Sequence, residues 1–296
     1  MSRLTPPFQE APPHDDLSDQ FFQLFLDPTR AYSCAYFERD DMTLQEAQFA
    51  KIDRALGALD LEPGMRLLDV GCGWGATMRR AIERYDVDVV GLTLSMNQAA
   101  HVQTAFDAMD STRNRVVRLG GWQEFDEPVD RIVSIAAFEH FGHARYPAFF
   151  QMAQQVLAPD GVLLLHTICI QPEDGQSVGA PLTLELARFI KFIFAEIFPG
   201  GQLASVPLVR RLANDAGFSV TREHSLQRHY AKTFEIWANT LQSNRRAAIE
   251  LQSEEVYQRY LRYLTGCADL FRQGELDVVE LTLEKFERQW IPGTQL

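Results

Sequence analysis

Long uncharged apolar runs are absent from this chain. The most apolar stretch, residues 189–198, is interrupted by Lys191 and Glu196, and the first seven residues contain no apolar signal core. A membrane-crossing helix needs about 20 apolar residues, and a secretory signal also needs an apolar core. We therefore expect no transmembrane segment and a cytoplasmic protein.

Cysteine is scarce as well, and the few cysteines are scattered. The four are Cys34, Cys72, Cys169 and Cys267, with no C-x-x-C pair and no histidines at ligand spacing. Zinc sites and disulfide frameworks depend on such spacings. The sequence therefore predicts no metal site and reduced thiols, which agrees with a cytoplasmic location.

Positive charge is the third deficit. The chain has 28 basic and 40 acidic residues, which gives a formal net charge of −12. This balance opposes nonspecific binding to nucleic acid or to anionic lipid. With 296 residues, 46% of them hydrophobic, the chain is long enough for one large domain with additions.

The most informative stretch is Leu67-Leu68-Asp69-Val70-Gly71-Cys72-Gly73-Trp74-Gly75, in which an apolar run leads into a glycine-rich turn. We expect a buried strand here, followed by a helix over residues 76–85. Glycines let the backbone approach a ligand closely, and the free N–H groups at a helix start attract anionic groups. A nucleotide-like cofactor is indicated, although a tight strand-to-helix turn is the structural alternative.

The type of nucleotide depends on the position of an acidic residue. Gly71-x-Gly73-x-x-Ala76 fits a loose dinucleotide fingerprint, which requires an acid about 20 residues later for the ribose. Residues 89–94 contain no acid, whereas Asp69 lies at the end of the strand and could face the ammonium of an amino-acid-like ligand. This favours S-adenosylmethionine over NAD.

After the glycine loop, predicted strands and helices alternate. We expect strands at 87–94, 115–119, 129–136 and 161–170 and helices at 97–109 and 146–157. Such alternation predicts an α/β fold with a parallel sheet and helices on both faces. Its ligand would lie beyond the carboxyl ends of the strands, where the candidate residues are Asp69, Thr93, Trp122, Glu139 and His166.

The remaining segments are expected to cover this edge within a single domain spanning residues 1–296. An N-terminal helical arm, residues 1–60, begins with prolines and contains helix-start signals at Ser18 and at Thr43 with Glu46. An insertion at about 171–217 contains the very apolar stretch 182–198. Helices at 233–251 and 254–271 and a last strand at 278–286 follow. The aromatic character of this cap suggests an apolar substrate. The alternative is that these side chains only extend the hydrophobic core.

Several motifs together resemble one known family. They are Tyr32-Ser33-Cys34-Ala35-Tyr36-Phe37-Glu38, the stretch Leu68 to Gly75, Val90-Gly91-Leu92-Thr93-Leu94-Ser95, Ala137-Phe138-Glu139-His140-Phe141-Gly142-His143, Glu196-Ile197-Phe198-Pro199-Gly200-Gly201 and Tyr263-Leu264-Thr265-Gly266-Cys267. The chain resembles the mycolic acid cyclopropane synthases and related methyltransferases within the cyclopropane-fatty-acid synthase family, nearly from end to end.

The resemblance implies a class I S-adenosylmethionine-dependent methyltransferase, a Rossmann-like sheet with a helical lipid-binding cap. The acceptor would be a long unsaturated meromycolyl chain on acyl carrier protein. Methyl transfer to the alkene would give a carbocation, and a bound bicarbonate ion would remove a proton to close the cyclopropane. The catalytic positions carried over are Glu139, His166, Tyr230, the Cys34 and Ile135 backbones and, with least support, Cys267.

The resemblance also assigns residues to the cofactor. They are Tyr32, Ser33, Asp69, Gly71, Gly73, Thr93, Leu94, Gln98, Trp122 and Gln123, with Trp122 flanking the adenine. Three positions depart from the family pattern. Gln123 stands where many relatives have an acid, Asp15 where a tyrosine is usual, and Ala136 where cyclopropanating relatives usually have glycine.

Alternatives remain open at this point. His166 could be a hydrogen-bonded core residue, Glu139 could simply begin a helix, and Cys267 could be a small buried hydrophobe. Three functions remain: a cyclopropane-forming enzyme, a sister enzyme whose cation is trapped by water to give a methyl-branched alcohol, and a noncatalytic lipid-binding protein. For carrier docking, we expect a basic patch built from Arg210, Arg211, Arg245 and Arg246.

Overall fold

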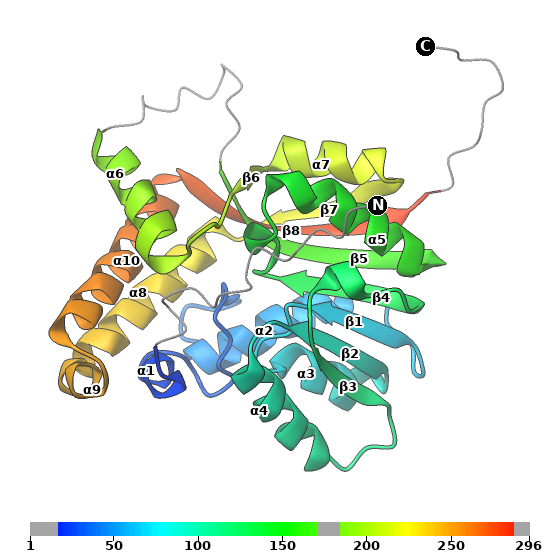
Figure 1. Cartoon of the computed structure of the whole chain (residues 1–296), viewed down its shortest axis with the longest axis horizontal. Coiled ribbons are helices and arrows are strands. Elements are labelled where there is room, and N and C mark those ends of the chain that lie inside the picture. The colour runs from blue at the N-terminus through cyan, green and yellow to red at the C-terminus, as the bar shows by residue number, and fades with distance from the viewer. Residues whose placement is uncertain (1–16, 171–183, 287–296) are drawn as a thin grey trace.

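The computed structural model describes residues 17–170 and 184–286 and contains one mixed sheet with helices on both faces (Figure 1). The strand order is β3-β2-β1-β4-β5-β8-β7, and the short β6 pairs with β5. The strands are β1 (Arg66–Val70), β2 (Asp88–Thr93), β3 (Arg115–Leu119), β4 (Val129–Ile135), β5 (Leu157–Ile170), β6 (Ala204–Ser205), β7 (Phe218–Ser225) and β8 (Leu276–Lys285).

The helices expected outside the insertion are present, although the one expected at 233–251 is divided in two, and α6 and α7 lie inside the insertion. The helices are α1 (Asp19–Gln23), α2 (Leu44–Gly57), α3 (Ala76–Tyr85), α4 (Met96–Asp107), α5 (Tyr146–Val156), α6 (Leu184–Phe192), α7 (Val206–Asp215), α8 (Gln227–Ser243), α9 (Arg245–Leu251) and α10 (Glu254–Gln273). Short helical turns are η2 (Trp122–Glu124), η3 (Phe138–His140), η4 (His143–Arg145) and the π-helical η5 (Ile193–Ile197). The starts of α1 at Ser18 and of α2 at Thr43 are confirmed.

The expectation of a parallel sheet is confirmed for β1 to β5. The other end of the sheet, for which no strand direction was predicted, is antiparallel. Strand β8 runs antiparallel to both β5 and β7 and lies between them. The predicted strand at 278–286 is thus confirmed, whereas β7 was not predicted. Its outer half carries Arg222, Glu223 and His224, as suits the edge of a sheet, so it lacks the apolar pattern of a central strand.

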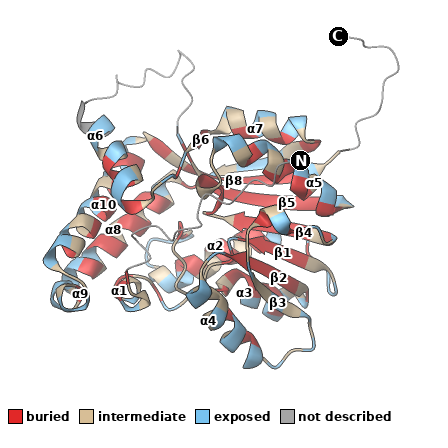
Figure 2. Ribbon diagram, viewed as in Figure 1, coloured by how far each residue is buried: buried red, intermediate tan, exposed pale blue. Residues whose placement is uncertain are grey.

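Alternate residues of β5 pack on opposite faces of the sheet. Leu163 and Leu165 belong to the core that includes residues of α5, whereas Val162 and Leu164 belong to the core that includes residues of α2 and α3. Because side chains alternate along a strand, His166 lies on the α2 face. Burial is concentrated on these strands and on the inner faces of the surrounding helices (Figure 2).

A second, strongly aromatic core joins α1 to the helices α8 and α10. For example, the rings of Phe21 in α1 and Tyr260 in α10 lie 5.0 Å apart, edge to face. The expected helix at 233–251 begins earlier, at Gln227, and breaks at Asn244. The Asn244 amide donates to the backbone oxygens of Leu24 and Thr240, and this side-chain hydrogen bonding competes with continuation of the helix.

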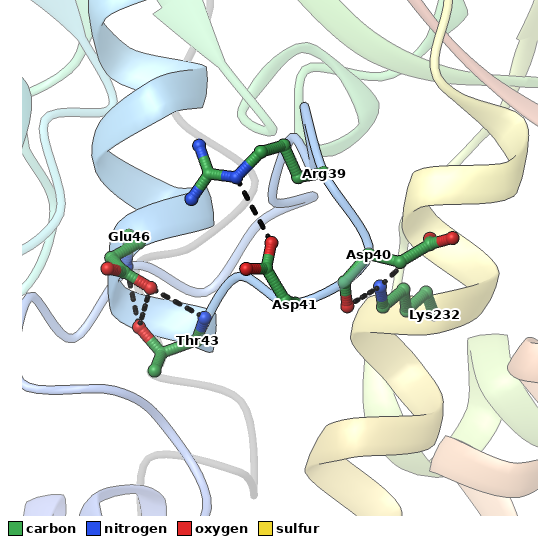
Figure 3. A network of polar contacts seen from close by, with 6 residues as sticks. All are labelled: Arg39, Asp40, Asp41, Thr43, Glu46 and Lys232. Carbon is green, nitrogen blue, oxygen red and sulfur yellow. Dashed lines mark hydrogen bonds and ion pairs between the residues drawn. The ribbon is translucent and has the colours of Figure 1, made fainter.

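The segment before α2 is connected to α8 (Figure 3). Thr43 and Glu46 form the expected capping box at the start of α2, and Lys232 of α8 donates to the backbone oxygen of Asp40 over 3.0 Å. These contacts, together with the aromatic core, hold the N-terminal helices beside α8.

The expected cap insertion at about 171–217 divides in the structure. Residues 171–183 lie outside the described residues, as do Asp15 and the proline-containing start of the arm. Helix α6 packs on α10. The Phe189 ring of α6 lies so close to Gly266 of α10 that a Cβ added at Gly266 would be 2.2 Å from the ring. Helix α7 instead packs against β7 and α5 on the sheet. Among the described residues, no helix is both long and apolar enough to cross a membrane.

Candidate active site

The glycine loop between β1 and α3 has the backbone that its composition predicts. Gly71, Gly73 and Gly75 have φ angles of 83°, 53° and 81°, a region that other residues rarely adopt. A Cβ added at Gly71 would lie 2.4 Å from the Cβ of Ala137, while the space beside Gly73 is open for 4 Å. The loop therefore requires glycine at position 71, and at Gly73 it leaves the backbone accessible to a ligand.

Asp69 is a buried carboxyl group directly before this loop. It is 2% exposed, and its Oδ2 atom has no hydrogen-bond partner among the described residues. Burial raises the pKa of Asp69 to about 7, and the nearby Lys51 ammonium opposes this shift. A ligand ammonium would complete the electrostatic environment of this carboxylate.

Lys51 is absent from the residues predicted for the site, yet it is a buried charge that interacts with Asp69 and Cys34. It is 2% exposed on α2, and its Nζ donates to the Ser33 hydroxyl over 2.9 Å. Burial lowers its pKa to about 8. A usable signal was present in the sequence, because Lys51 lies four residues from both Ala47 and Ala55, on the apolar side of a predicted helix.

The segment before α2 is fixed from both sides. Gln48 of α2 donates to the backbone oxygen of Ser33 over 2.8 Å. The Tyr32 ring lies 5.3 Å from the Trp237 ring of α8, and the Tyr32 hydroxyl is buried without a hydrogen-bond partner among the described residues. This segment thus connects the sheet domain to the aromatic helices.

The ends of β2 and β3 contribute a second group of predicted cofactor residues. The Thr93 hydroxyl bonds to the Gln98 side-chain oxygen over 2.6 Å, and the neighbouring Leu94 is 57% exposed. Trp122 is only 5% exposed, because its ring packs against Phe141 and Phe149. Leu94 therefore offers a free apolar surface to a ligand, and Trp122 offers little of its ring.

Gln123 bends back toward Gly121, two residues earlier in the chain. Its Oε1 atom would lie 2.2 Å from a Cβ added at Gly121, and the side chain is only partly buried. The assignment of Gln123 to the cofactor stays a prediction.

Glu139 is a buried acid in η3, at the carboxyl edge of the sheet. It is 6% exposed, and Oε1 accepts the Ile168 N–H over 2.6 Å, whereas Oε2 has no partner among the described residues. Burial raises the pKa of Glu139 to about 7, partly opposed by the Ile168 bond. At neutral pH this group can hold or release a proton.

His166 lies at the carboxyl half of β5 and is 1% exposed. Neither ring nitrogen has a hydrogen-bond partner among the described residues, and Nδ1 lies 3.7 Å from Oε2 of Glu280. Burial lowers the pKa of His166, and Glu280 opposes this effect. Glu280 is a second buried charge that sequence reasoning did not identify.

Tyr230 lies in the same buried core as Cys34 and Cys267. Burial raises its pKa well above the usual value, and electrostatic interactions with Cys34, Tyr32, Glu139 and Cys267 add to this effect. Burial also raises the pKa of the Cys34 and Cys267 thiols. Both cysteines are therefore protonated at neutral pH, so neither is a thiolate nucleophile.

The turn after β4 stores backbone strain beside His166. Ala136 has a φ of 54°, in the left-handed region that disfavours a Cβ, and its N–H donates to the His166 backbone oxygen over 2.8 Å. Ile135 pairs with His166 in the β4–β5 register. The Ile135 backbone is thus next to His166, and its assignment to the site stays a prediction.

The predicted basic patch does not form. Arg210 and Arg211 lie on α7 and Arg245 and Arg246 on α9, and Figure 1 places these helices at opposite ends of the molecule. Three of the four are already paired with acids, because Arg210 contacts Glu223, Arg245 contacts Glu254 and Arg246 contacts Glu250. The prediction failed because residues of the same type on different helices need not share a surface.

The described residues contain no cluster of His, Cys, Asp and Glu that could hold a metal ion.

Comparison with known proteins relates this arrangement to a family. A family model described as mycolic acid cyclopropane synthetase matches residues 2–281. Cyclopropane mycolic acid synthase 3 of Mycobacterium tuberculosis is 64% identical over 285 residues, which cover 96% of this chain and 99% of that protein.

Solved structures extend the similarity to the fold. The cyclopropane synthase MmaA2 from Mycobacterium tuberculosis has a TM-score of 0.93 and 62% identity, covering 96% of this chain and all of that one. The mycolic acid cyclopropane synthase CmaA1, complexed with SAH and CTAB, has a TM-score of 0.88 and 63% identity, covering 91% of this chain and 95% of that one.

Proposed function

Because this chain belongs to the mycolic acid cyclopropane synthetase family, we propose that it transfers the methyl group of S-adenosylmethionine to a double bond of a long unsaturated acyl chain and closes a cyclopropane ring. Its Rossmann-like α/β sheet is that of S-adenosylmethionine-dependent methyltransferases. The observation that carries the proposal is that two predicted catalytic side chains, Glu139 and His166, are buried with unpartnered atoms, while Tyr230, a third, is buried in the aromatic core.

The donor would bind at the glycine loop. Asp69 offers a buried carboxylate for the ammonium of its amino-acid part, and Gly73 leaves open backbone beside it. S-adenosylhomocysteine is the product left by methyl transfer, and SAH is the ligand named in the CmaA1 complex. When bound, S-adenosylmethionine supplies an electrophilic methyl group. Lys51 and Ser33 would orient the neighbouring segment.

The acceptor would lie against the aromatic layer formed by α1, α6, α8 and α10. This layer buries Tyr230, Phe234 and Tyr263, and the Phe234 and Tyr263 rings lie 5.6 Å apart, edge to face. Aromatic faces exclude water and stabilise a passing cation. CTAB, which is named in the CmaA1 complex, is a long-chain cationic detergent and therefore a plausible mimic of such an acceptor. The proposed natural acceptor is a meromycolyl chain on acyl carrier protein. The carrier would have to dock without the arginine patch described above.

A small anion would suit these two side chains. The free Oε2 of Glu139 and the free ring nitrogens of His166 are buried atoms that bicarbonate could satisfy. When bound, bicarbonate supplies negative charge beside the carbocation and a base for the methyl proton. Glu139, whose pKa of about 7 allows it to be protonated, would donate to the anion rather than repel it.

One observation favours the sister product. Ala136 holds a Cβ at a strained position beside His166, where the resemblance leads us to expect glycine. If this Cβ shifts the base, water could trap the cation and give a methyl-branched alcohol. This hydroxylated product is the second candidate.

Product mass and ligand stabilisation test these proposals. With a monounsaturated acyl substrate, ring formation adds the mass of one methylene, whereas trapping by water adds one methylene and one water. S-adenosylhomocysteine should raise the melting temperature, because it binds the folded state, and NAD should not. Stabilisation by NAD alone, or no methylated product at all, would overturn the proposed function.

A further inference from the structure

Three titratable side chains lie in one row across the sheet. In the β5–β8 register His166 is opposite Glu280, and in the β8–β7 register Glu280 is opposite His224. Directly opposite residues of antiparallel strands have Cβ atoms about 5 Å apart on the same face. The row therefore runs from the buried His166 on β5 to β7, the edge strand of the sheet.

The inner part of the row is dehydrated and incompletely bonded. His166 and Glu280 are 1% and 4% exposed, with 3.7 Å between Nδ1 and Oε2. Neither ring nitrogen of His166 nor Oε2 of Glu280 has a hydrogen-bond partner among the described residues. A small turn of the ring, or one water molecule, would connect the two groups.

The outer part of the row reaches solvent. Glu280, His224, Arg222 and Arg54 help to line a surface cavity of about 150 Å³. Arg54 of α2 forms an ion pair with the other carboxylate oxygen of Glu280 over 3.0 Å. His224 is only partly buried, so its ring can exchange protons with water.

We propose that His166, Glu280 and His224 carry the proton released by ring closure from the active site to this cavity. The proposal rests on the proposed function. The C–S bond of the donor breaks as its methyl carbon bonds to one alkene carbon. A methyl C–H bond then breaks as its electron pair forms the second ring bond, and one proton is left at the site base. An acyl chain that covers the site would exclude the water through which this proton could otherwise leave. Each turnover therefore needs another route that carries the proton to solvent.

The surrounding charges suit this task. Burial alone would raise the pKa of Glu280, but His166 and Arg54 outweigh it, and the pKa lies below its usual value. Burial lowers the pKa of His166 and the Glu280 carboxylate opposes this, so the ring can take up a proton beside a carboxylate that stabilises its charged form. The other groups that interact with Glu280 are Lys51 of α2, Cys34 and, across the row, His224.

The first test replaces Glu280. Glu280→Gln keeps the shape but cannot relay a proton, so turnover should fall about tenfold or more. The solvent deuterium isotope effect should rise as proton exit becomes limiting, while stabilisation by S-adenosylhomocysteine stays unchanged. Glu284→Gln, an exposed glutamate on the same strand, is the matched control and should behave as the unmodified protein.

The second test does not depend on a buried substitution. His224→Ala removes the outer ring from an edge strand, and imidazole added to the buffer should enter the cavity and restore turnover in a saturable manner. The unmodified protein and Glu284→Gln should not respond to imidazole. This variant decides the outcome if Glu280→Gln loses its response to S-adenosylhomocysteine and is therefore misfolded.

The outcomes separate the two proposals. If the unmodified protein methylates the alkene while both variants keep its turnover and isotope effect, the relay is refuted and the proposed function stands. Slow turnover that imidazole does not restore in His224→Ala would also refute it, since the ring would then be structural. If the unmodified protein gives no product, both proposals fall.

Discussion

Replacing Glu139 by glutamine should lower activity and stabilise the folded protein at alkaline pH. Glutamine preserves the shape of the side chain and an oxygen for the Ile168 N–H, which lies 2.6 Å from Oε1. It cannot hold or release a proton. Loss of a positioned proton-transfer group lowers turnover by about 10²-fold or more, and the cation should then be trapped by water more often.

The stability effect follows from the pKa of the same group. Burial raises the pKa of Glu139 from 4.5 to about 7, so the folded state retains a proton that the unfolded state loses. Its contribution to stability is complete below pH 4.5, decreases as pH rises toward 7 and is lost above that. A shift of this size corresponds to about 3 kcal/mol in the free energy of unfolding, or about 5 °C in melting temperature for a chain of this length.

Urea denaturation at pH 5 and pH 8 measures this effect, and product mass at saturating donor measures turnover. The stability of Glu139→Gln relative to the unmodified protein should increase with pH, whereas exposed Glu284→Gln should show no such trend. If the difference in unfolding free energy between the two proteins did not change with pH, the raised pKa of Glu139 in the folded state would be refuted. Unchanged turnover with greatly weakened binding of S-adenosylhomocysteine would instead make Glu139 a donor-site residue.

Three further substitutions test other parts of the site. Because the pKa of Asp69 is about 7, affinity for S-adenosylhomocysteine should decrease about tenfold per pH unit below 7, and calorimetry should find weak, pH-independent binding in Asp69→Asn. Lys51→Met removes the 2.9 Å bond to Ser33 and should weaken the same binding about tenfold, and equal affinity in the two proteins would exclude this positioning role. Ala136→Gly relieves a φ of 54° and should raise stability in urea by about 1 kcal/mol, whereas a loss would show that the turn is not strained.

Local signals in the sequence were sufficient for much of the fold. Glycines that require positive φ identified the loop after β1, and side-chain oxygens at Ser18 and Thr43 identified two helix starts. The alternation of apolar segments identified β1 to β5 as a parallel sheet. Each of these features depends on residues within a few positions of one another, so the chain carries them without reference to its remote parts.

Tertiary packing decided the rest. The insertion of β8 between β5 and β7, the break at Asn244 and the packing of α7 on the sheet depend on distant partners. The same is true of the charges at the site. Lys51 lies on the apolar side of its predicted helix, but nothing in the sequence marks Glu280, and only the elements packed over both residues remove their water. Because a pKa depends on dehydration and on neighbouring charges, the protonation of the site was settled by the folded structure.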